Sequence, residues 1–172
     1  MTDSAASKQH SNKEASAPLT FALITASDTR TKEEDTAGAA LAQLIAADGG
    51  RLSRYEICKD NRATISAAIV AACDTGVDIV ITCGGTGLSP RDVTPEATAD
   101  VCDRNVPGIA EAMRAYSLAI TKRAMLSRAV CMQRGTTLVV NFPGSEKAVR
   151  ENWAAIHEQL PHAVRMSAGG GH

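Results

Sequence analysis

Apolar residues recur along the chain with two different spacings, and the spacing changes from one stretch to the next. Short apolar runs bounded by turn residues predict strands, whereas apolar side chains three and four positions apart predict amphipathic helices. Ala37, Leu41, Leu44 and Ile45, for example, fall on one face of an expected helix. The first half of the chain reads strand 19–26, helix 36–48, strand 52–58, helix 62–74 and strand 77–82. This β-α-β-α-β order predicts parallel strands joined by right-handed crossovers.

The second half of the chain continues with helices, a strand pair and a closing helix. The expected elements are helices 94–102 and 107–120, strands 130–133 and 136–142, and helix 146–160. Thr94 is expected to cap the first of these helices, with Pro95 at the first helical position. An Arg-Gly pair separates the two strands and predicts a hairpin-like turn. Pro161 is expected to end the last helix.

Length and composition predict the domain organisation. A chain of 172 residues predicts one domain, which we place at 19–165. Residues 1–18 are rich in Ser, Ala, Lys and Asn and lack the apolar core of a signal peptide, so we interpret them as a disordered tail. The Gly-rich end, 166–172, is expected to be flexible as well.

Charge, aromatic content and cysteine pattern narrow the functional classes. A net charge of −1 and an aromatic content of 3% argue against nucleic-acid binding, because neither a basic stripe nor a stacking platform is visible. The longest apolar runs are too short to span a membrane. The five cysteines contain no Cys-x-x-Cys pair, which predicts reduced core thiols and a cytoplasmic protein. They are Cys58, Cys73, Cys83, Cys102 and Cys131.

A glycine-rich loop follows the predicted strand 77–82 and is the most informative stretch of the chain. Glycines at a strand end let backbone N–H groups approach an anion, and phosphate is the usual one. The loop lacks the lysine of a P-loop, and Pro90 replaces the third glycine of a dinucleotide fingerprint. A purely structural turn is the alternative interpretation. Ser89, Arg91 and Asp92 in the same loop favour an anion site instead.

Loops that follow parallel strands converge on one edge of a sheet. Four loops are expected to meet there, namely Ser27-Asp28, Lys59-Asp60-Asn61, Gly84 to Asp92, and Pro143 to Ser145. Asp60 and Asp92 both follow apolar strands, and two carboxylates beside phosphate form a typical Mg²⁺ site. For Asp60 an equally good interpretation is that it caps the helix beginning at Arg62.

Other candidate residues also have two interpretations. Arg91 either neutralises phosphate charge or is simply solvated. Ser27 and Asp28 are expected to bind ligand or to cap the turn before the first helix, and Ser145 to donate to phosphate or to cap the last helix; these roles are compatible. The two histidines near the end of the chain, His157 and His162, have no ligand partner in the sequence and are expected at the surface.

Several motifs in this chain, occurring in the same order, resemble the MoaB/Mog family of molybdenum cofactor biosynthesis proteins. They are Gly84-Gly85-Thr86-Gly87, Arg91-Asp92-Val93-Thr94-Pro95-Glu96-Ala97, Asn141-Phe142-Pro143-Gly144-Ser145, Lys147-Ala148, Ser27-Asp28-Thr29 and Asp35-Thr36-Ala37-Gly38. The resemblance runs from about Leu19 to Leu160. It implies an α/β fold, a three-layer α-β-α sandwich with a mostly parallel sheet.

The resemblance also implies an activity, the Mg²⁺-dependent adenylylation of molybdopterin by ATP. Asp60 and Asp92 match family positions linked to catalysis and would hold the metal. The expected substrate-binding residues are Ser27, Asp28, Gly84, Gly85, Thr86, Gly87, Ser89, Arg91, Pro143, Gly144 and Ser145. The family forms trimers or hexamers, so a homo-oligomer is expected. Two alternatives remain, a non-catalytic molybdopterin-binding protein and a dinucleotide pyrophosphatase of the competence/damage-inducible type.

Overall fold

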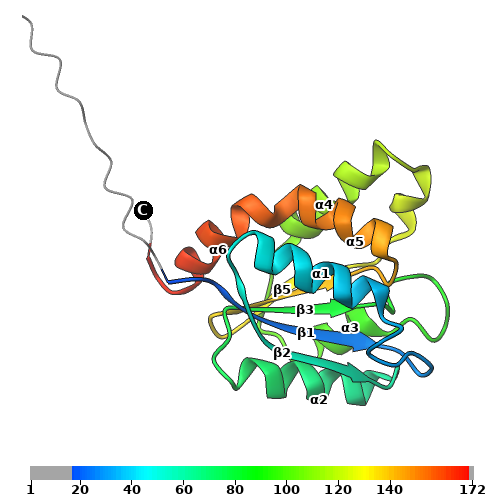
Figure 1. Ribbon diagram of the computed structural model, residues 1–172, viewed down its shortest axis with the longest axis horizontal. Coiled ribbons are helices and arrows are strands. Elements are labelled where there is room, and N and C mark those ends of the chain that lie inside the picture. Colours follow the sequence, from blue (N-terminus) through cyan, green and yellow to red (C-terminus); the bar gives the residue numbers. More distant parts are fainter. Residues whose placement is uncertain (1–16, 171–172) are drawn as a thin grey trace, which may run out of the picture.

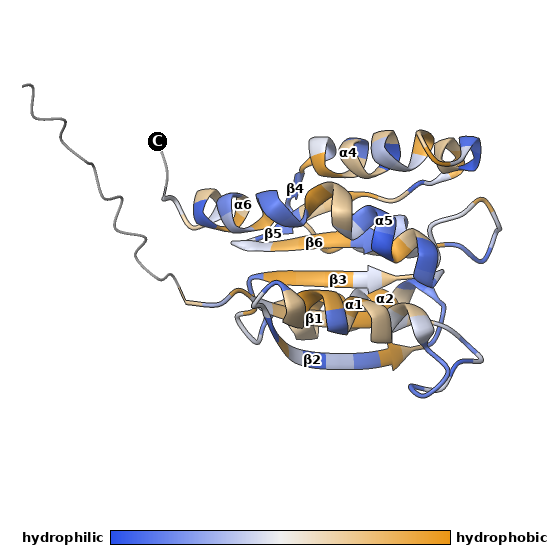
Figure 2. Cartoon of the chain, turned by 45° about the horizontal axis from the view of Figure 1, so that its top comes forward, coloured by the Kyte–Doolittle hydropathy of each residue, from blue (hydrophilic) through white to orange (hydrophobic). Residues whose placement is uncertain are grey.

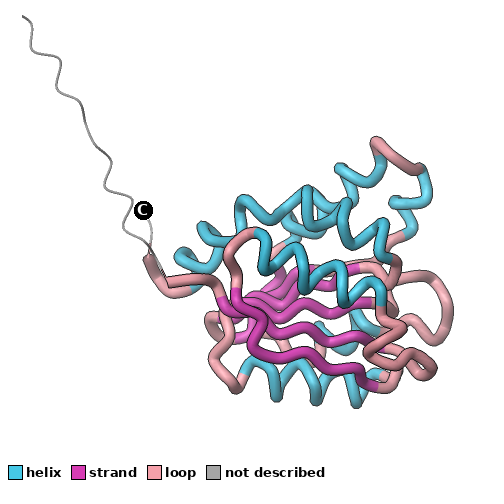
Figure 3. Tube along the Cα trace, in the orientation of Figure 1, coloured by secondary structure: helices cyan, strands magenta, loops and turns pink. Residues whose placement is uncertain are grey.

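A single mixed sheet forms the centre of the molecule (Figures 1 and 3). The structure is a computed structural model that describes residues 17–170. The strands are β1 (Thr20–Ala26), β2 (Arg51–Cys58), β3 (Ile79–Cys83), β4 (Arg104–Asn105), β5 (Cys131–Arg134) and β6 (Thr137–Phe142). They are arranged in the order β2-β1-β3-β6-β5-β4. The strands β2, β1, β3 and β6 run parallel, and β5 is antiparallel to both of its neighbours. The parallel crossovers and the hairpin-like pair are confirmed.

Helices cover both faces of this sheet, which gives the expected three-layer α-β-α sandwich (Figure 1). The helices are α1 (Thr36–Ala47), α2 (Arg62–Cys73), α3 (Thr94–Ala99), α4 (Pro107–Leu118), α5 (Glu146–Ile156) and α6 (Leu160–Ser167), with short 3-10 helices at Lys122–Leu126 (η1) and His157–Gln159 (η2). The apolar residues of α1, α4, α5 and α6 share one core with one face of the sheet. Those of α2 and α3 share a second core with the other face.

The strand sequences alternate between these two cores with a period of two. In β1, Leu23 belongs to the core under α1, whereas Ala22 and Ile24 belong to the core under α2. In β6, Val140 and Val139 divide in the same way. Both faces of each central strand are therefore apolar, as parallel strands require, and Figure 2 shows β3 and β6 as mainly hydrophobic ribbons.

Three helices begin at side chains that satisfy free backbone N–H groups. Asp35 accepts from the N–H of Gly38, Asn61 from that of Thr64, and Ser145 from that of Ala148. The N-cap interpretation of Ser145 is therefore confirmed. The cap of α2 is Asn61, so the interpretation of Asp60 as that cap is wrong.

Two sequence-based helix termini are wrong. Thr94 is the first residue of α3 rather than its cap, since Val93 takes the cap position and the hydroxyl of Thr94 has no hydrogen-bond partner among the described residues. The single helix 146–160 is interrupted at 157–159, and Pro161 lies in the first turn of α6 instead of ending α5. Proline is tolerated there because the N–H groups of a first helical turn have no partner within the helix.

The predictions for the two ends are only partly within the described residues. Most of the predicted tail, 1–18, lies outside them. At the other end α6 continues to Ser167, so Met166 and Ser167 are helical; the flexibility predicted for 166–172 stays a prediction. All five cysteines are free; Cys83 and Cys131 are buried and the other three half-buried. Among residues 17–170, no helix combines the length and apolar character needed to cross a membrane.

Candidate functional site

The loops at the carboxyl ends of the parallel strands form one polar cleft of about 470 Å³. In Figure 1 this edge lies to the right, where the strand arrows point. Its lining includes most of the predicted residues: Ser27, Asp28, Asp60, Gly84, Gly85, Thr86, Gly87, Arg91, Asp92 and Gly144. Thr29, Arg30 and Ala26 complete it. The convergence of four loops separated in sequence is therefore confirmed as geometry.

The glycine loop requires glycine at two positions. Gly84 has φ +96° and Gly85 has φ +65°, values that side-chain-bearing residues rarely adopt. A side chain at Gly85 would also collide with the hydroxyl of Thr94, and one at Gly84 would press on the carbonyl of Ala26. The backbone here lies open to the cleft because no side chain covers it.

Arg128, which comes much later in the sequence, holds this loop in place through hydrogen bonds. Its Nε donates to the carbonyl of Gly87 (2.7 Å) and its Nη2 to the carbonyl of Asp92 (2.5 Å). Its guanidinium also pairs with Glu96, which lowers the pKa of that carboxyl. The backbone N–H of Arg128 also donates to the carbonyl of Thr86 (2.9 Å). The planar fork thus joins the middle of the loop, at Gly87, to its end at Asp92.

Asp60 offers a carboxylate oxygen that nothing in the described protein satisfies. Its Oδ1 is buried without a hydrogen-bond partner. Burial and then the nearby carboxylates of Asp28 and Asp92 raise the pKa of Asp60, while the guanidinium of Arg91 lowers it. A buried carboxylate oxygen is costly unless it receives a hydrogen bond or a cation. Asp60 therefore has the chemistry of a metal-binding or proton-binding group.

Asp92 lies on the glycine loop, and one of its oxygens is already used. Its Oδ2 accepts from the backbone N–H of Ser89 (2.9 Å), and the hydroxyl oxygen of Ser89 accepts from the backbone N–H of Arg91 (3.3 Å). Ser89 therefore shapes the loop and does not line the cleft. No cluster of three or more Asp, Glu, His or Cys side chains able to hold a metal occurs within residues 17–170. The Asp60–Asp92 pair fits a Mg²⁺ that takes its remaining ligands from phosphate and water.

The rim residues are held by local contacts. Ser27 accepts from the N–H groups of Thr29 (3.3 Å) and Arg30 (3.1 Å), so it fixes the turn after β1. Asp28 accepts from the N–H of Asp60 (3.1 Å) and forms an ion pair with Arg91. That pair spans loops from different strands, although the Arg91 side chain remains 70% exposed.

Three predicted residues near the last helix divide between two places. Gly144 lines the polar cleft. Pro143 instead lines a neighbouring hollow of about 280 Å³, whose walls include Met113 and Leu126 and which shares Thr86 and Gly87 with the cleft. Ser145 is exposed and lines neither.

His157 and His162 make their contacts away from the cleft. His162 is exposed, as predicted. His157 is half-buried and stacks on Trp153 with an interplanar angle of 15°, so it is only partly at the surface. Its Nδ1 lies 3.0 Å from the carbonyl of Trp153.

Comparisons with known proteins show the family of this chain. The family model described as a probable molybdopterin binding domain matches residues 22–162. The chain belongs to the MoaB/Mog family.

Individual relatives extend this assignment. A protein of Helicobacter pylori named molybdopterin adenylyltransferase is 36% identical over 86% of this chain and 86% of its own length. The molybdenum cofactor synthesis protein cinnamon of Drosophila melanogaster is 38% identical over 86% of this chain, which spans only 25% of that longer protein. A crystal structure of molybdenum cofactor biosynthesis protein B superimposes with a TM-score of 0.85 at 36% identity, covering 89% of this chain and 98% of that one.

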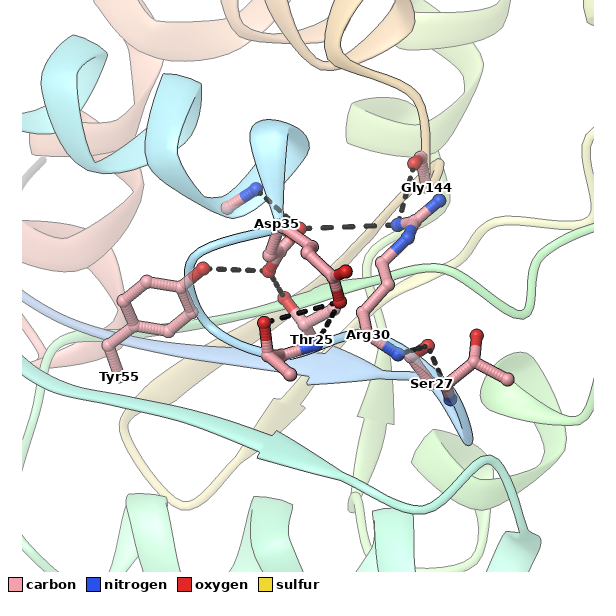
Figure 4. Close-up of polar contacts among 10 residues, drawn as sticks. Thr25, Ser27, Arg30, Asp35, Tyr55 and Gly144 are labelled. Carbon is pink, nitrogen blue, oxygen red and sulfur yellow. Dashed lines mark hydrogen bonds and ion pairs between the residues drawn. The ribbon is translucent and has the colours of Figure 1, made fainter.

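Sequence reasoning missed several residues of this MoaB/Mog-like site. Arg128 clamps the glycine loop across 41 positions of sequence. Arg30 lines the cleft and donates to the carbonyl of Gly144 (3.1 Å), and Asp35 lies buried behind it (Figure 4). The available signal for Arg30 was its place three residues after the Ser27 turn. Nothing local marked Arg128, whose partners all come from another part of the chain.

Proposed function

We propose that this protein is a molybdopterin adenylyltransferase. An oxygen of the terminal phosphate of molybdopterin attacks the α-phosphorus of ATP, the bond to the β-phosphate breaks, and pyrophosphate leaves. The name of the Helicobacter pylori relative and the polar cleft at the sheet edge support this reaction. Such a transfer needs positioning and charge neutralisation more than a covalent intermediate.

Different residues of the cleft have different roles in this reaction. The backbone N–H of Gly84 donates to the carbonyl of Phe142 (3.0 Å), so the N–H groups of Gly85 to Gly87 would bind phosphate oxygens, and Arg128 keeps that loop in shape. Asp60 and Asp92 would hold Mg²⁺, which when bound neutralises phosphate charge and stabilises the leaving pyrophosphate. The Asp28–Arg91 pair fixes the loop that carries Asp60, and Gly144 forms the opposite wall.

The apolar hollow beside the cleft suits the ring system of a substrate. It shares Thr86 and Gly87 with the cleft, so a molecule could place its phosphate in one and its ring in the other. Met113, Leu126 and Pro143 give it an apolar wall. Flat rings bind in such hollows through burial of apolar surface.

The single observation that carries the proposal is the orphaned oxygen of Asp60. It is buried, has no hydrogen-bond partner in the described protein and lies in a cleft that Gly85 also lines. A cation that enters with a polyphosphate would bind this oxygen. The unfavourable burial of the carboxylate would then be offset when the substrate is bound.

The test is the Asp60→Asn variant, which keeps the shape of the side chain and removes its charge. We expect formation of adenylylated molybdopterin from ATP and Mg²⁺ to fall at least about 100-fold, with binding of molybdopterin retained. Product and pyrophosphate are measured together, beside the wild type. The exposed neighbour Lys59 supplies the matched control, Lys59→Gln, whose turnover should equal the wild type.

The outcomes separate the candidate functions. Equal turnover in Asp60→Asn would remove Asp60 from the mechanism. A wild type that binds molybdopterin tightly without turnover would support the non-catalytic alternative, and hydrolysis of ADP-ribose would support the pyrophosphatase.

We also propose that the protein is cytoplasmic and acts as a homo-oligomer, a trimer or hexamer as the family resemblance implies. Large apolar side chains are exposed on and after α4, including Tyr116, Leu118, Ile120 and Met125. Exposed apolar groups gathered on one segment often mark protein contacts. Sedimentation velocity measures the assembly directly.

A further inference from the structure

Arg30 occupies a defined place at the rim of the cleft, although it is a long side chain on a loop. The Ser27 hydroxyl fixes its backbone through the N–H of Arg30 (3.1 Å). At the other end, its Nη1 donates to the carbonyl of Gly144 (3.1 Å) and lies 4.0 Å from Asp35 (Figure 4). The guanidinium therefore bridges the loop after β1 and the loop after β6, and 41% of the side chain stays exposed.

Asp35, behind Arg30, is completely buried and held by three donors. It accepts from the hydroxyl of Thr25 (2.5 Å), the hydroxyl of Tyr55 (2.7 Å) and the backbone N–H of Gly38 (3.0 Å). A side chain at Gly38 would collide with both Tyr55 and Asp35, so the helix start is packed directly on this group. The carboxylate thus has no freedom to move.

Tyr55 contributes to this rigidity as a permanent donor. Burial, and then the hydrogen bond to Asp35, raise the pKa of the Tyr55 hydroxyl, so it stays protonated and donates. The ammonium of Lys32 lies 4.7 Å from the centre of the Tyr55 ring, within the range of a cation–π contact. A fixed carboxylate in this position holds a cation at a fixed place as well.

The charges of the cleft leave a distinct role for Arg30. The other arginine in the lining, Arg91, is paired with Asp28, while Asp60 and Asp92 add negative charge near the glycine loop. A substrate phosphate entering this cleft needs a positive group besides any metal. Arg30 supplies it, since its contacts are one carbonyl and a carboxylate 4.0 Å away.

We propose that Arg30 binds a phosphate group of a substrate beside Gly144 and that Asp35 is the positioning residue that holds Arg30 there. This inference rests on the proposed function for the identity of the substrates. The phosphate belongs either to ATP or to molybdopterin, and the recognition chemistry, a guanidinium against phosphoryl oxygens, is the same for both.

The first experiment uses Arg30→Gln and inorganic pyrophosphate in metal-free buffer, measured by calorimetry. We expect binding to weaken about 10- to 100-fold, as for loss of one charge-assisted contact. Arg150→Gln on the exposed face of α5 is the matched control for lost charge and should bind like the wild type. Equal binding by Arg30→Gln and the wild type would overturn the proposal.

A double-mutant cycle tests the positioning role of Asp35. Asp35→Asn should weaken pyrophosphate binding several-fold when Arg30 is present and should add nothing in the Arg30→Gln background. Independent, additive effects would reduce Asp35 to a structural role. If Asp35→Asn does not fold, Tyr55→Phe removes one of its donors and gives the same cycle in a milder form.

Steady-state kinetics then identify the phosphate. A higher KM for ATP with an unchanged KM for molybdopterin in Arg30→Gln would assign Arg30 to the nucleotide, and the reverse result to the pterin. No change in either KM would contradict the proposal. A wild type that binds pyrophosphate through Arg30 but forms no adenylylated product would instead refute the proposed function alone.

Discussion

The ionised carboxylate of Asp60 destabilises the folded state at neutral pH. Its pKa is raised by burial and by the carboxylates of Asp28 and Asp92. The folded state therefore holds a proton on Asp60 more tightly than the unfolded chain does. Stability falls as pH rises from the ordinary pKa, about 3.9, through the higher folded value, and remains lowered above it.

Asp60→Asn should consequently be more stable than the wild type at pH 7. The two proteins should converge as the pH falls below the ordinary pKa of about 3.9, because only there does the wild-type carboxyl become protonated in both states. Urea unfolding at a series of pH values between about 3 and 8 measures the difference. A variant that is less stable at pH 7 would mean that the carboxylate is satisfied in solution.

Arg128→Lys tests the clamp on the glycine loop. Lysine keeps the charge but loses the fork that reaches Gly87 and Asp92 together. We expect a loss of about 1 to 3 kcal/mol in the free energy of unfolding. We also expect faster hydrogen exchange confined to residues 84–92. Unchanged exchange there would show that the loop holds its shape without the arginine.

The role of a single residue could be predicted from the sequence only where that role depends on residues close to it in the chain. Asp60, Gly84 and Asp92 follow apolar strands directly, so the pattern of the sequence was sufficient to bring them into one cleft. Asp35 and Arg128 act on partners 20 and 41 positions away. No spacing along the chain records such contacts.

At the scale of elements, Asn61 has two effects because it caps α2 and directly follows Asp60. Asn61→Ala should cost about 1 kcal/mol of stability, as loss of an N-cap does. It should also lower adenylylation, since the cap holds the turn that presents Asp60. Asn61→Asp keeps a capping oxygen and should retain stability. Thermal unfolding and turnover of the two variants are compared side by side.

Elements with a strong period were predictable, and short ones were not. The strands and α1, α2 and α4 followed their apolar spacing to within a few residues. The two-residue β4 and the 3-10 helix η1 are too short to show a period. The break between α5 and α6 escaped because Leu160 continues the apolar stripe of α5 into the core, which hides the interruption before Pro161.

At the scale of the whole molecule, the cleft exists only when distant segments are folded together. Ser27, Asp60, Gly84 and Gly144 come from four separate loops. A ligand that binds there binds the folded state alone, so it should stabilise the entire domain. At 100 times its Kd, ATP with Mg²⁺ should add about 2.7 kcal/mol, which corresponds to roughly 5 to 11 °C in the thermal midpoint.

Differential scanning fluorimetry over a series of ATP concentrations measures this shift. Asp60→Asn should show a smaller shift than the wild type, because the metal contributes less to its binding. An absence of any shift at millimolar ATP in the wild type would contradict the assignment of the cleft to nucleotide.

The two ends of the described chain lie at the edge of the sheet opposite the cleft. Ala17 and Pro18 share one hollow with Val164 and Arg165, next to the residues that precede β2 and β3. Both ends of the described residues therefore lie away from the loops that line the cleft. The domain is therefore suited to be one module of a larger protein, as in cinnamon, where the matching region is a quarter of the chain.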